Sequence, residues 1–300
     1  MVPGHEHKAF VPYNGFFATV ARENASRHAV VQARALSVRP HYLQLDREWQ
    51  GSAQIPFEYL VVATGTRLAE PAGMKDDDKV SSVAYLQKHQ AGVQQAKSIV
   101  IVGGGAVGVQ MATDLKEYYP DKEVTVVQSR PKLMPQFHEK LHEIVKARFD
   151  ELGVKLVTGA RVSMPPNGFP SSSGGSQITV QLTNGTELTT DFVIMATGQT
   201  PNNGLVKDLA ASGKSIVNPD NGFIRIQPTM QFQDPNYSHL FAVGDIADTG
   251  VRKAARPGSA QAAVVAKNIQ ALIENRTPEE QYPRVPAAIH ITLGMVSWHI

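Results

Sequence analysis

Three glycines, Gly103, Gly105 and Gly108, stand at the spacing with which a protein backbone approaches a phosphate group. They follow a β-branched apolar run and open a helical pattern. Such a turn leaves backbone N–H groups bare, and the start of the helix adds partial positive charge. The strand–turn–helix–strand pattern covers residues 99–127, close to the roughly 30 residues of a βαβ unit. The glycines alone are a weak signal, but in this context they predict a pyrophosphate site.

The second strand of this unit ends at a position that commonly holds the ribose of adenosine. That position is Gln128, with Arg130 two residues further on. Glutamine can bond a ribose hydroxyl and does not repel a 2′-phosphate as a carboxylate would. Arg130 could pair with such a phosphate, or it could be a solvated loop residue. The sequence therefore allows NADH or NADPH.

The tripeptide Ala-Thr-Gly occurs twice, each time directly after a short apolar strand. The first copy contains Thr64 and Gly65, and the second ends at Gly198. A small residue and a glycine at a strand end let the backbone approach a cofactor at the carboxyl edge of a sheet. We therefore expect both copies to face bound ligands.

A third strand end carries Gly244 and Asp245, ahead of an Ala- and Val-rich helical pattern at 259–274. A carboxylate there can accept a hydrogen bond from a cofactor hydroxyl, while the helix start favours an electron-rich group. Asp245 alone would be interpreted as a turn cap. Because Asp245 follows the glycine motif and both copies of Ala-Thr-Gly along the chain, a role in a cofactor site is favoured.

The elements that must position these residues alternate between strands and helices, which predicts an α/β fold with a parallel sheet. The expected strands are 59–63, 99–102, 124–127, 154–157, 192–196 and 240–243; the expected helices are 18–28, 83–96, 106–119, 139–152 and 259–274; the expected hairpins are 35–38 with 43–45 and 178–182 with 187–189.

Composition excludes several other functions. The 29 Lys and Arg residues nearly balance the 27 Asp and Glu residues, which argues against nucleic-acid binding. There is no cysteine, so the chain has no disulfide scaffold and no thiol chemistry. The histidines lack convincing metal-ligand spacing, so no metal site is expected. No apolar run reaches the about 20 residues of a membrane span, and no secretory signal is present, so a cytoplasmic protein is expected.

The ordered set IVIVGGGAVGVQMA, VIMATGQTPNN and LFAVGDIADT resembles the flavoproteins with two dinucleotide-binding domains. The stretch AKSIVIVGGGAVGVQMATDLKEYYPDKEVTVVQSRPKLMP is similar to the apoptosis-inducing-factor-like branch, especially the ferroptosis-suppressor type and its fungal relatives. The likeness extends from about Tyr59 to Asn275. It implies two Rossmann-like domains, one for FAD and one for NAD(P)H. In this family, hydride passes from nicotinamide to flavin and electrons pass on to a quinone or another acceptor.

Carried over by position, the resemblance assigns the pyrophosphate of the nicotinamide dinucleotide to Gly103, Gly105 and Gly108. Gly198 would lie beside the same cofactor. The family often has glutamate near the nicotinamide amide, two residues after the last motif glycine. This chain has Gln110 there, which can still bond a carboxamide.

On the FAD side, the resemblance assigns contacts to the strand-end residues of the first Ala-Thr-Gly and the last motif. Gly65, with Thr64 before it, would contact FAD, and Asp245, after Gly244, would bind its ribityl chain. Leu36 is a weaker candidate for a backbone contact on the adenine side.

The resemblance also divides the chain. It implies a partial FAD-binding domain at 1–95, an NAD(P)-binding Rossmann domain at 96–200, a continuation of the FAD domain at 201–285, and the start of a C-terminal interface region at 286–300. The NAD(P) domain is thus inserted into an incomplete FAD domain.

One departure concerns the FAD side. The family opens with its own strand, glycine motif and helix for FAD, whereas the first such motif in this chain is the nicotinamide one. We therefore expect a chain truncated at both ends, in which FAD loses its main pyrophosphate cradle and binds less tightly.

Two functions follow as hypotheses. The first is an NAD(P)H:acceptor flavin oxidoreductase, with a quinone-like small molecule as acceptor. The alternative is a flavin-free NAD(P)H-binding module or an inactive fragment. Type II NADH:quinone dehydrogenase shares the architecture but normally adds a membrane-anchoring C-terminal helix. The resemblance also allows peripheral association with a membrane or lipid droplet, or a mitochondrial location.

Overall fold

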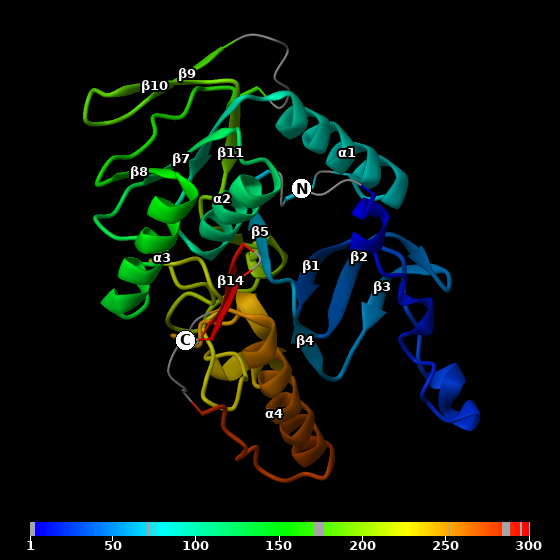
Figure 1. The fold of residues 1–300 in the computed structure, drawn as a ribbon. Coiled ribbons are helices and arrows are strands. Elements are labelled where there is room, and N and C mark those ends of the chain that lie inside the picture. Colours follow the sequence, from blue (N-terminus) through cyan, green and yellow to red (C-terminus); the bar gives the residue numbers. More distant parts are fainter. Residues whose placement is uncertain are drawn as a thin grey trace. The chain divides into compact units, whose positions relative to one another are not determined.

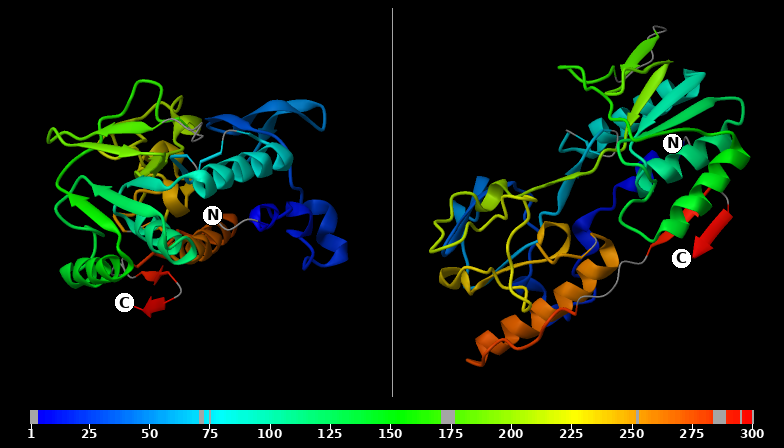
Figure 2. Two further views of the ribbon diagram at one scale, coloured as in Figure 1. Left: turned by 45° about the horizontal axis from the view of Figure 1, so that its top comes forward. Right: turned by 90° about the vertical axis from the view of Figure 1, so that its left-hand side faces the viewer.

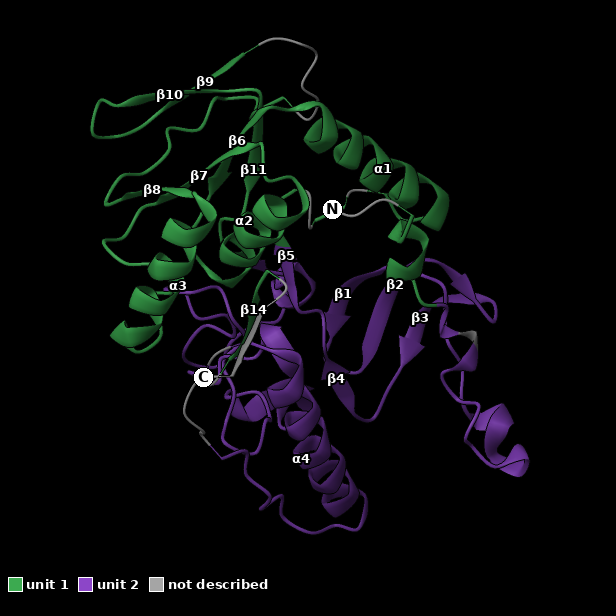
Figure 3. Ribbon diagram, viewed as in Figure 1, with its two compact units in different colours: residues 1–11, 68–199, 288–300 green, residues 12–67, 200–287 purple. Residues whose placement is uncertain are grey.

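The computed structural model describes residues 4–70, 73–74, 76–170, 177–251, 253–283, 289–294 and 296–299. The chain forms two compact units (Figure 3). Unit 1 comprises Met1–Val11, Leu68–Gln199 and Ala288–Ile300; unit 2 comprises Pro12–Arg67 and Thr200–Ala287.

Unit 1 is built on a four-stranded parallel sheet in the order β11–β6–β7–β8 (Figure 1). The strands are β6 (Ser98–Val102), β7 (Glu123–Gln128), β8 (Lys155–Thr158) and β11 (Phe192–Met195). In β6 the four residues after Ser98 are all buried. A strand covered on both faces needs such a continuous apolar run, because alternate side chains point to opposite sides.

The two faces of this sheet are covered differently. Ile99 and Ile101 belong to the cluster that also contains residues from the helices α1 (Lys79–Gln95), α2 (Ala106–Tyr118) and α3 (Glu139–Leu152). Val100 and Val102 belong to a second cluster with residues of the hairpin β9–β10 and its neighbours. The hairpin strands are β9 (Ile178–Gln181) and β10 (Glu187–Thr190). Unit 1 is therefore a three-layered α/β unit with a hairpin in place of one helical layer.

Local sequence fixes the ends of these helices. Asp78 caps α1 by accepting a hydrogen bond from the Ser81 N–H at 2.8 Å. Gly153 ends α3 in the left-handed conformation with φ 71°, as a C-cap glycine does. The expected helix at 139–152 is thus confirmed to the residue.

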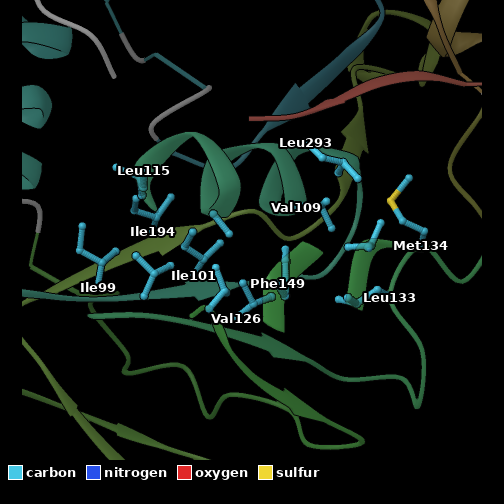
Figure 4. Close-up of a cluster of buried hydrophobic side chains, with 14 of the residues drawn as sticks. Ile99, Ile101, Val109, Leu115, Val126, Leu133, Met134, Phe149, Ile194 and Leu293 are labelled. Atoms are coloured by element: carbon cyan, nitrogen blue, oxygen red, sulfur yellow. The ribbon is translucent and has the colours of Figure 1, made fainter. Parts of the chain in front are cut away.

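A hairpin of residues near the C-terminus completes unit 1. Its strands are β14 (His290–Leu293) and β15 (Val296–His299). Ile291 and Leu293 of β14 are fully buried in the helix-side core, where Figure 4 shows Leu293 beside Val109 of α2. Figures 1 and 2 show β14, in red, alongside α2.

Unit 2 combines a three-stranded antiparallel sheet with a pair of parallel strands. The antiparallel sheet has the order β1–β2–β3, with β1 (Ala35–Arg39), β2 (Tyr42–Trp49) and β3 (Ser52–Pro56). The parallel pair is β4 (Leu60–Val62) with β13 (Leu240–Ala242). Two further short strands, β5 (Thr66–Leu68) and β12 (Gln199–Pro201), form a separate two-stranded sheet.

The core of unit 2 joins the parallel pair to the helix α4 (Ala255–Ile273). Phe232 and Phe241 are its largest fully buried side chains. Short 3₁₀ helices complete the chain: η1 (Glu6–Ala9), η2 (Tyr13–Gly15), η3 (Arg22–Arg27), η4 (Gly204–Val206), η5 (Pro235–Tyr237) and η6 (Gly244–Ile246).

Several expected elements differ from the structure in extent or type. The helix expected at 18–28 is replaced by 3₁₀ turns, because that stretch buries no residue of η3. Helix α4 begins at Ala255, four residues before the expected start. Strand β3 was not expected.

The division into units also differs from the expected boundary between residues 95 and 96. Helix α1 lies within unit 1, because Val93 and Ala96 are buried in the core of that unit. Residues 284–288, 295 and 300 of the expected C-terminal region lie outside the described residues. Among the helices that the structure describes, none has the length and hydropathy to cross a bilayer.

Candidate dinucleotide sites

Two of the three motif glycines in unit 1 are required by the packing of the protein itself. Gly103 has φ 120°, and a Cβ there would lie 2.3 Å from the Ala196 carbonyl oxygen. A Cβ on Gly108 would lie 1.9 Å from the Gly103 carbonyl oxygen. Both distances are far below contact, so a side chain on Gly108 would force α2 away from the end of β6, and one on Gly103 would push against the backbone that follows β11. These glycines bring the start of α2 onto the end of the strand.

Gly105 has no such reason to be glycine. Its φ is −83°, which any residue adopts, and a Cβ built there meets nothing within 4 Å. It is the N-cap residue of α2, and no side chain caps this helix start. Open space therefore lies over bare backbone at the positive end of a helix, which is the arrangement that binds a phosphate group. The residues of this turn fit the diphosphate of a nicotinamide dinucleotide.

Gln128 is hydrogen-bonded to the protein at both ends of its side-chain amide. It is 7% exposed, and its Oε1 accepts a hydrogen bond from the Gly104 N–H at 3.2 Å. Its Nε2 donates to the Lys132 carbonyl oxygen at 3.0 Å. Both ends of the amide thus tie the glycine turn to the loop after β7. Gln128 therefore supports the glycine turn, and its expected contact with a ribose remains a prediction.

Arg130 is exposed in the same loop. It lines a pocket of about 290 Å³, together with Lys132, His138 and His142. Lys132 forms an ion pair with Glu139. Arg130, which lines the same pocket, forms no ion pair among the residues that the structure describes. The pocket lies directly after the second strand of the βαβ unit.

Gly198 lies at the same carboxyl edge of the sheet. The Ala196 N–H donates to the Val102 carbonyl oxygen at 2.8 Å, which extends the β11–β6 pairing past the end of β11. Gly198 follows with φ 58°, and a Cβ there would meet nothing within 4 Å. The second Ala-Thr-Gly therefore ends in an open turn beside the glycine turn of β6.

Gln110 is half-buried on α2, two residues after Gly108. Its Nε2 donates to Thr292 Oγ1 of β14 at 2.9 Å. The amide is thereby held by the C-terminal hairpin.

Unit 2 contains the counterpart of this arrangement. Gly65 has φ 60°, close to that of Gly198, and a Cβ there would also meet nothing within 4 Å. The Thr64 hydroxyl donates to the Asn202 carbonyl oxygen at 2.9 Å, and the Asn202 side-chain amide donates to the Thr64 carbonyl oxygen at 2.9 Å. The Asn202 N–H donates to the Gly65 carbonyl oxygen at 3.0 Å. Three hydrogen bonds between this turn and one asparagine hold it, two of them donated by Asn202 and one by Thr64.

The neighbouring strand β13 ends in a similar turn. The Val243 N–H donates to the Val62 carbonyl oxygen at 3.0 Å, and Gly244 follows with φ 71°. The Gly244 N–H donates to Oε1 of Gln261, a residue of α4 that is 2% exposed. Gly258, near the start of α4, packs on Gly244. A Cβ on Gly258 would lie 3.5 Å from the Gly244 Cα, which is an ordinary contact.

Asp245 is half-buried after this turn, and its carboxylate makes no hydrogen bond among the described residues. It is therefore able to accept from a ligand hydroxyl, and it fits the ribityl position assigned by the resemblance. Burial lowers the pKa of Lys253, and the negative charges of Asp248 and Asp245 oppose that shift. The Lys253 ammonium donates to the Ala247 carbonyl oxygen and lies 4.1 Å from the Phe223 ring centre.

Leu36 occupies a β-bulge in β1, an edge strand of the antiparallel sheet. The register with β2 shifts between Ala35 and Ser37, which leaves Leu36 as the extra residue. Its side chain is 49% exposed. The bulge on an edge strand leaves backbone groups free of the ladder, as a backbone contact with a ligand requires.

Sequence reasoning missed Asn202, Gln261, Lys253 and Thr292. Asn202 belongs to the quoted stretch VIMATGQTPNN, shortly after the second Ala-Thr-Gly. The repetition of this tripeptide was the signal available in the sequence, because it suggests that the segments around the two copies lie together. Lys253 follows Gly244 on the strand–helix connection, and Gln261 lies on the helix α4 that comes next. Thr292 lies 182 positions from Gln110, and no local pattern connects them.

Paired parallel strands that end in open glycine turns, one of them at the start of a helix, are typical of a dinucleotide-binding α/β protein. Residues 7–266 match the profile of the pyridine nucleotide-disulphide oxidoreductase family. The chain belongs to this family, whose members bind FAD and NAD(P)H.

The relatives support the resemblance to the apoptosis-inducing-factor-like branch. The chain is 35% identical to Fe-regulated protein 8 of Mycosarcoma maydis over 98% of this chain and 75% of that protein. It is 31% identical to human ferroptosis suppressor protein 1 over 82% of this chain and 64% of that protein.

A solved structure shares the fold. The ferredoxin reductase for the CYP199A2 system of Rhodopseudomonas palustris superposes with a TM-score of 0.66 at 20% identity, over 92% of this chain and 64% of that one. The expected fold class, with Rossmann-like dinucleotide-binding units, is confirmed. This chain spans about two thirds of the length of that reductase.

Proposed function

We propose that this chain is an FAD-dependent oxidoreductase that takes hydride from NADH or NADPH and passes electrons to a small quinone-like acceptor. The observation that carries the proposal is that one structural arrangement occurs in both units. In each unit two parallel strands end in adjacent positive-φ glycine turns with open space over at least one of them. A protein that binds a single dinucleotide needs this arrangement only once.

In unit 1, the chain's part is to hold the nicotinamide dinucleotide. The N–H groups at the start of α2 would bind the diphosphate, with Gly105 leaving room for it. Gly198 would let the backbone approach the same ligand from β11. Gln110 would meet the nicotinamide carboxamide.

In unit 2, the chain's part is to hold FAD. When bound, FAD supplies an acceptor for hydride that can release electrons one or two at a time. Asp245 would accept hydrogen bonds from the ribityl chain, and the turns at Gly65 and Gly244 would let the backbone approach it. Gln261 fixes the Gly244 turn, and Leu36 would offer its backbone on the adenine side.

A small molecule suits the role of acceptor because the 300 residues contain no cysteine, so no redox disulfide of this chain can take the electrons. The resemblance to the ferroptosis-suppressor type supports a quinone. The same resemblance supports association with a membrane or lipid droplet.

The test uses the purified full chain. Bound flavin is measured by its absorbance after release, and oxidation of NADH and of NADPH is followed with a soluble quinone as acceptor. We expect about one FAD per chain and quinone-dependent turnover. A colourless protein that binds NAD(P)H without turnover would establish the flavin-free alternative instead.

A further inference from the structure

A cavity of about 230 Å³ lies within unit 2, on segments that carry none of the residues proposed to contact FAD. Its walls come from residues 212–216, Arg225 and residues 233–235. Sites for drug-sized ligands begin at about 300 Å³, so this cavity suits a smaller ligand. The charged residues of the lining are two cations, Lys214 and Arg225, and one carboxylate, Asp234.

The guanidinium of Arg225 is fixed in position but has few partners in the protein. The Arg225 N–H donates to the Ile216 carbonyl oxygen at 2.9 Å, and the Arg225 carbonyl oxygen accepts from the Gln233 N–H at 3.0 Å. Of the side chain, Nη2 donates to Asn218 Oδ1 at 3.3 Å. Nε is buried without a partner, and Nη1 forms no hydrogen bond within the described part of the chain. An acceptor bound at Nη1 would therefore balance the charge of this half-buried guanidinium.

Asn218 holds the guanidinium from the side of the protein. Its Nδ2 donates to Asp248 Oδ2 at 2.7 Å, and its Oδ1 accepts from Arg225. A carboxylate can only accept and a guanidinium can only donate, so these two partners fix which end of the Asn218 amide faces Arg225. The cation is thus held in place before any ligand binds.

The loop at 212–215 adds a second cation and bare backbone. The N–H groups of Gly213, Lys214 and Ser215 donate no hydrogen bond to the residues that the structure describes. The Lys214 side chain is exposed and forms no ion pair with those residues. Successive backbone N–H groups in a turn can bind an anion, and a neighbouring lysine adds charge-assisted hydrogen bonds.

The one carboxylate of the lining is committed to the protein. Asp234 is 6% exposed and accepts from the Ser212 N–H at 2.7 Å, from Ser212 Oγ at 2.8 Å and from the Asn236 N–H at 3.0 Å. These bonds tie the start of the loop to the opposite wall. Within the described chain Asp234 forms no ion pair with Lys214 or Arg225, so neither cation is neutralised by it.

We propose that this cavity binds a phosphate group, either as the free anion or as the monoester of a small molecule. The Lys214 ammonium, Arg225 Nη1 and the bare N–H groups of the loop would donate to its oxygens. The proposal goes beyond the oxidoreductase function and does not depend on it, because none of these residues is assigned to FAD or to NAD(P)H.

The experiment uses the full chain and follows acetylation of individual lysines by mass spectrometry. The reagent is a soluble N-hydroxysuccinimide ester, and the probes are inorganic phosphate and phenyl phosphate at constant ionic strength. Near saturation, the bound anion should slow acetylation of Lys214 by at least about threefold. Lys207, an exposed lysine of the same unit outside the cavity lining, is the matched control and should change by less than about 1.5-fold.

A variant tests the second cation. Arg225→Gln removes the guanidinium charge, so the probe concentration that gives half of the Lys214 protection should rise about tenfold. Arg225→Lys retains a cation and should show a smaller rise. Where Arg225→Gln does not fold, the contrast between Lys214 and Lys207 in the wild-type chain decides.

The two probes distinguish the sources of the phosphate group. Stronger protection by inorganic phosphate would support a site for the free anion, and stronger protection by phenyl phosphate would support a site for a monoester. Equal slowing of Lys214 and Lys207, no slowing of Lys214 by either probe, or full protection in Arg225→Gln would overturn the proposal.

Discussion

The two units end their parallel strands in similar glycine turns but hold those turns by different means. In unit 1 the turn is packed backbone against backbone, because Gly103 and Gly108 leave no room for a Cβ, and the Gln128 amide adds one hydrogen bond to it. In unit 2 the turns are held by side-chain amides, with Gln261 on Gly244 and Asn202 on the Thr64–Gly65 turn. Both kinds of turn use glycine, in unit 2 because Gly65 and Gly244 have positive φ, so the sequence shows both as motifs. The sequence does not show the side-chain amides of Asn202 and Gln261 that hold the unit 2 turns.

The largest expected effect is a contrast between two helix glycines. Gly108→Ala places a Cβ against the Gly103 carbonyl oxygen and should cost at least about 3 kcal/mol of unfolding free energy. Gly258→Ala makes an ordinary contact with Gly244, so it should change stability by less than about 1 kcal/mol. Urea denaturation measures both. Equal losses would show that the two units use the same close packing.

Gly105 tests the ligand side of the unit 1 turn without testing its packing. Gly105→Glu has open space for its side chain and an ordinary φ, so the melting temperature should stay within a few degrees of wild type. Its carboxylate would occupy the phosphate site, and NAD(P)H affinity should fall by about 100-fold or more. Calorimetry measures the affinity, and Gly105→Ala is the control of intermediate size. Unchanged NAD(P)H affinity in Gly105→Glu would show that the phosphate group does not bind over Gly105.

In unit 2 the amide support should matter more for FAD than for stability. Gln261→Leu leaves the Gly244 N–H without its partner, which costs about 1–3 kcal/mol. The turn then loses its fixed position, and the FAD content of the purified protein should fall by at least half. Gln261→Glu retains an acceptor oxygen and should preserve the FAD content. Loss of FAD in both variants would contradict this account of the turn.

His89 provides a pH-dependent probe of unit 1 that unit 2 should not share. Burial lowers its pKa to about 4, its Nε2 has no hydrogen-bond partner within the described residues, and its ring packs edge-on against Phe192. The unfolded chain takes up a proton near pH 6.5, whereas the folded unit does so only near pH 4. Stability is therefore full above pH 6.5 and falls towards pH 4, by about 2–3 kcal/mol in total.

His89→Leu removes this loss while keeping an apolar contact with Phe192. Urea denaturation at pH 7 and pH 5, read by probes in each unit, should show a reduced pH dependence in unit 1 only. An unchanged difference between the two pH values would assign the acid sensitivity to other groups.

The smallest expected effect concerns the choice of nucleotide. Arg130 is the exposed cation of the loop pocket after β7. If it meets a 2′-phosphate, Arg130→Glu should raise the KM for NADPH about tenfold and leave the KM for NADH within about twofold. Steady-state rates with both nucleotides measure this. An equal change in the KM for NADPH and the KM for NADH would show that Arg130 does not meet a 2′-phosphate and is a solvated loop residue.

What the sequence predicted follows from local rules. The helix at 139–152 with its Gly153 cap, and the hairpin around Asn184 and Gly185, are specified by neighbours in the chain, and both are confirmed. The glycine turns were found for the same reason.

Long-range pairings were not predictable in this way. The position of Gln128 at a strand end does not show that its amide bonds to Gly104 and Lys132. The bond between Gln110 and Thr292, and the assignment of helix α1 to unit 1, depend on packing between distant segments. The individual ligand contacts remain predictions, since they depend on partners that are not part of the chain.

The interleaving of the two units has a consequence for biosynthesis. Unit 1 needs Ile291 and Leu293 to close its core, although its sheet is complete by Met195. Unit 2 draws its last residues from before position 288. During translation the sheet of unit 1 therefore emerges first but must wait, with one side of its core open, until after unit 2 has left the ribosome. The unit whose sheet is synthesised first is therefore the last to have its core completed.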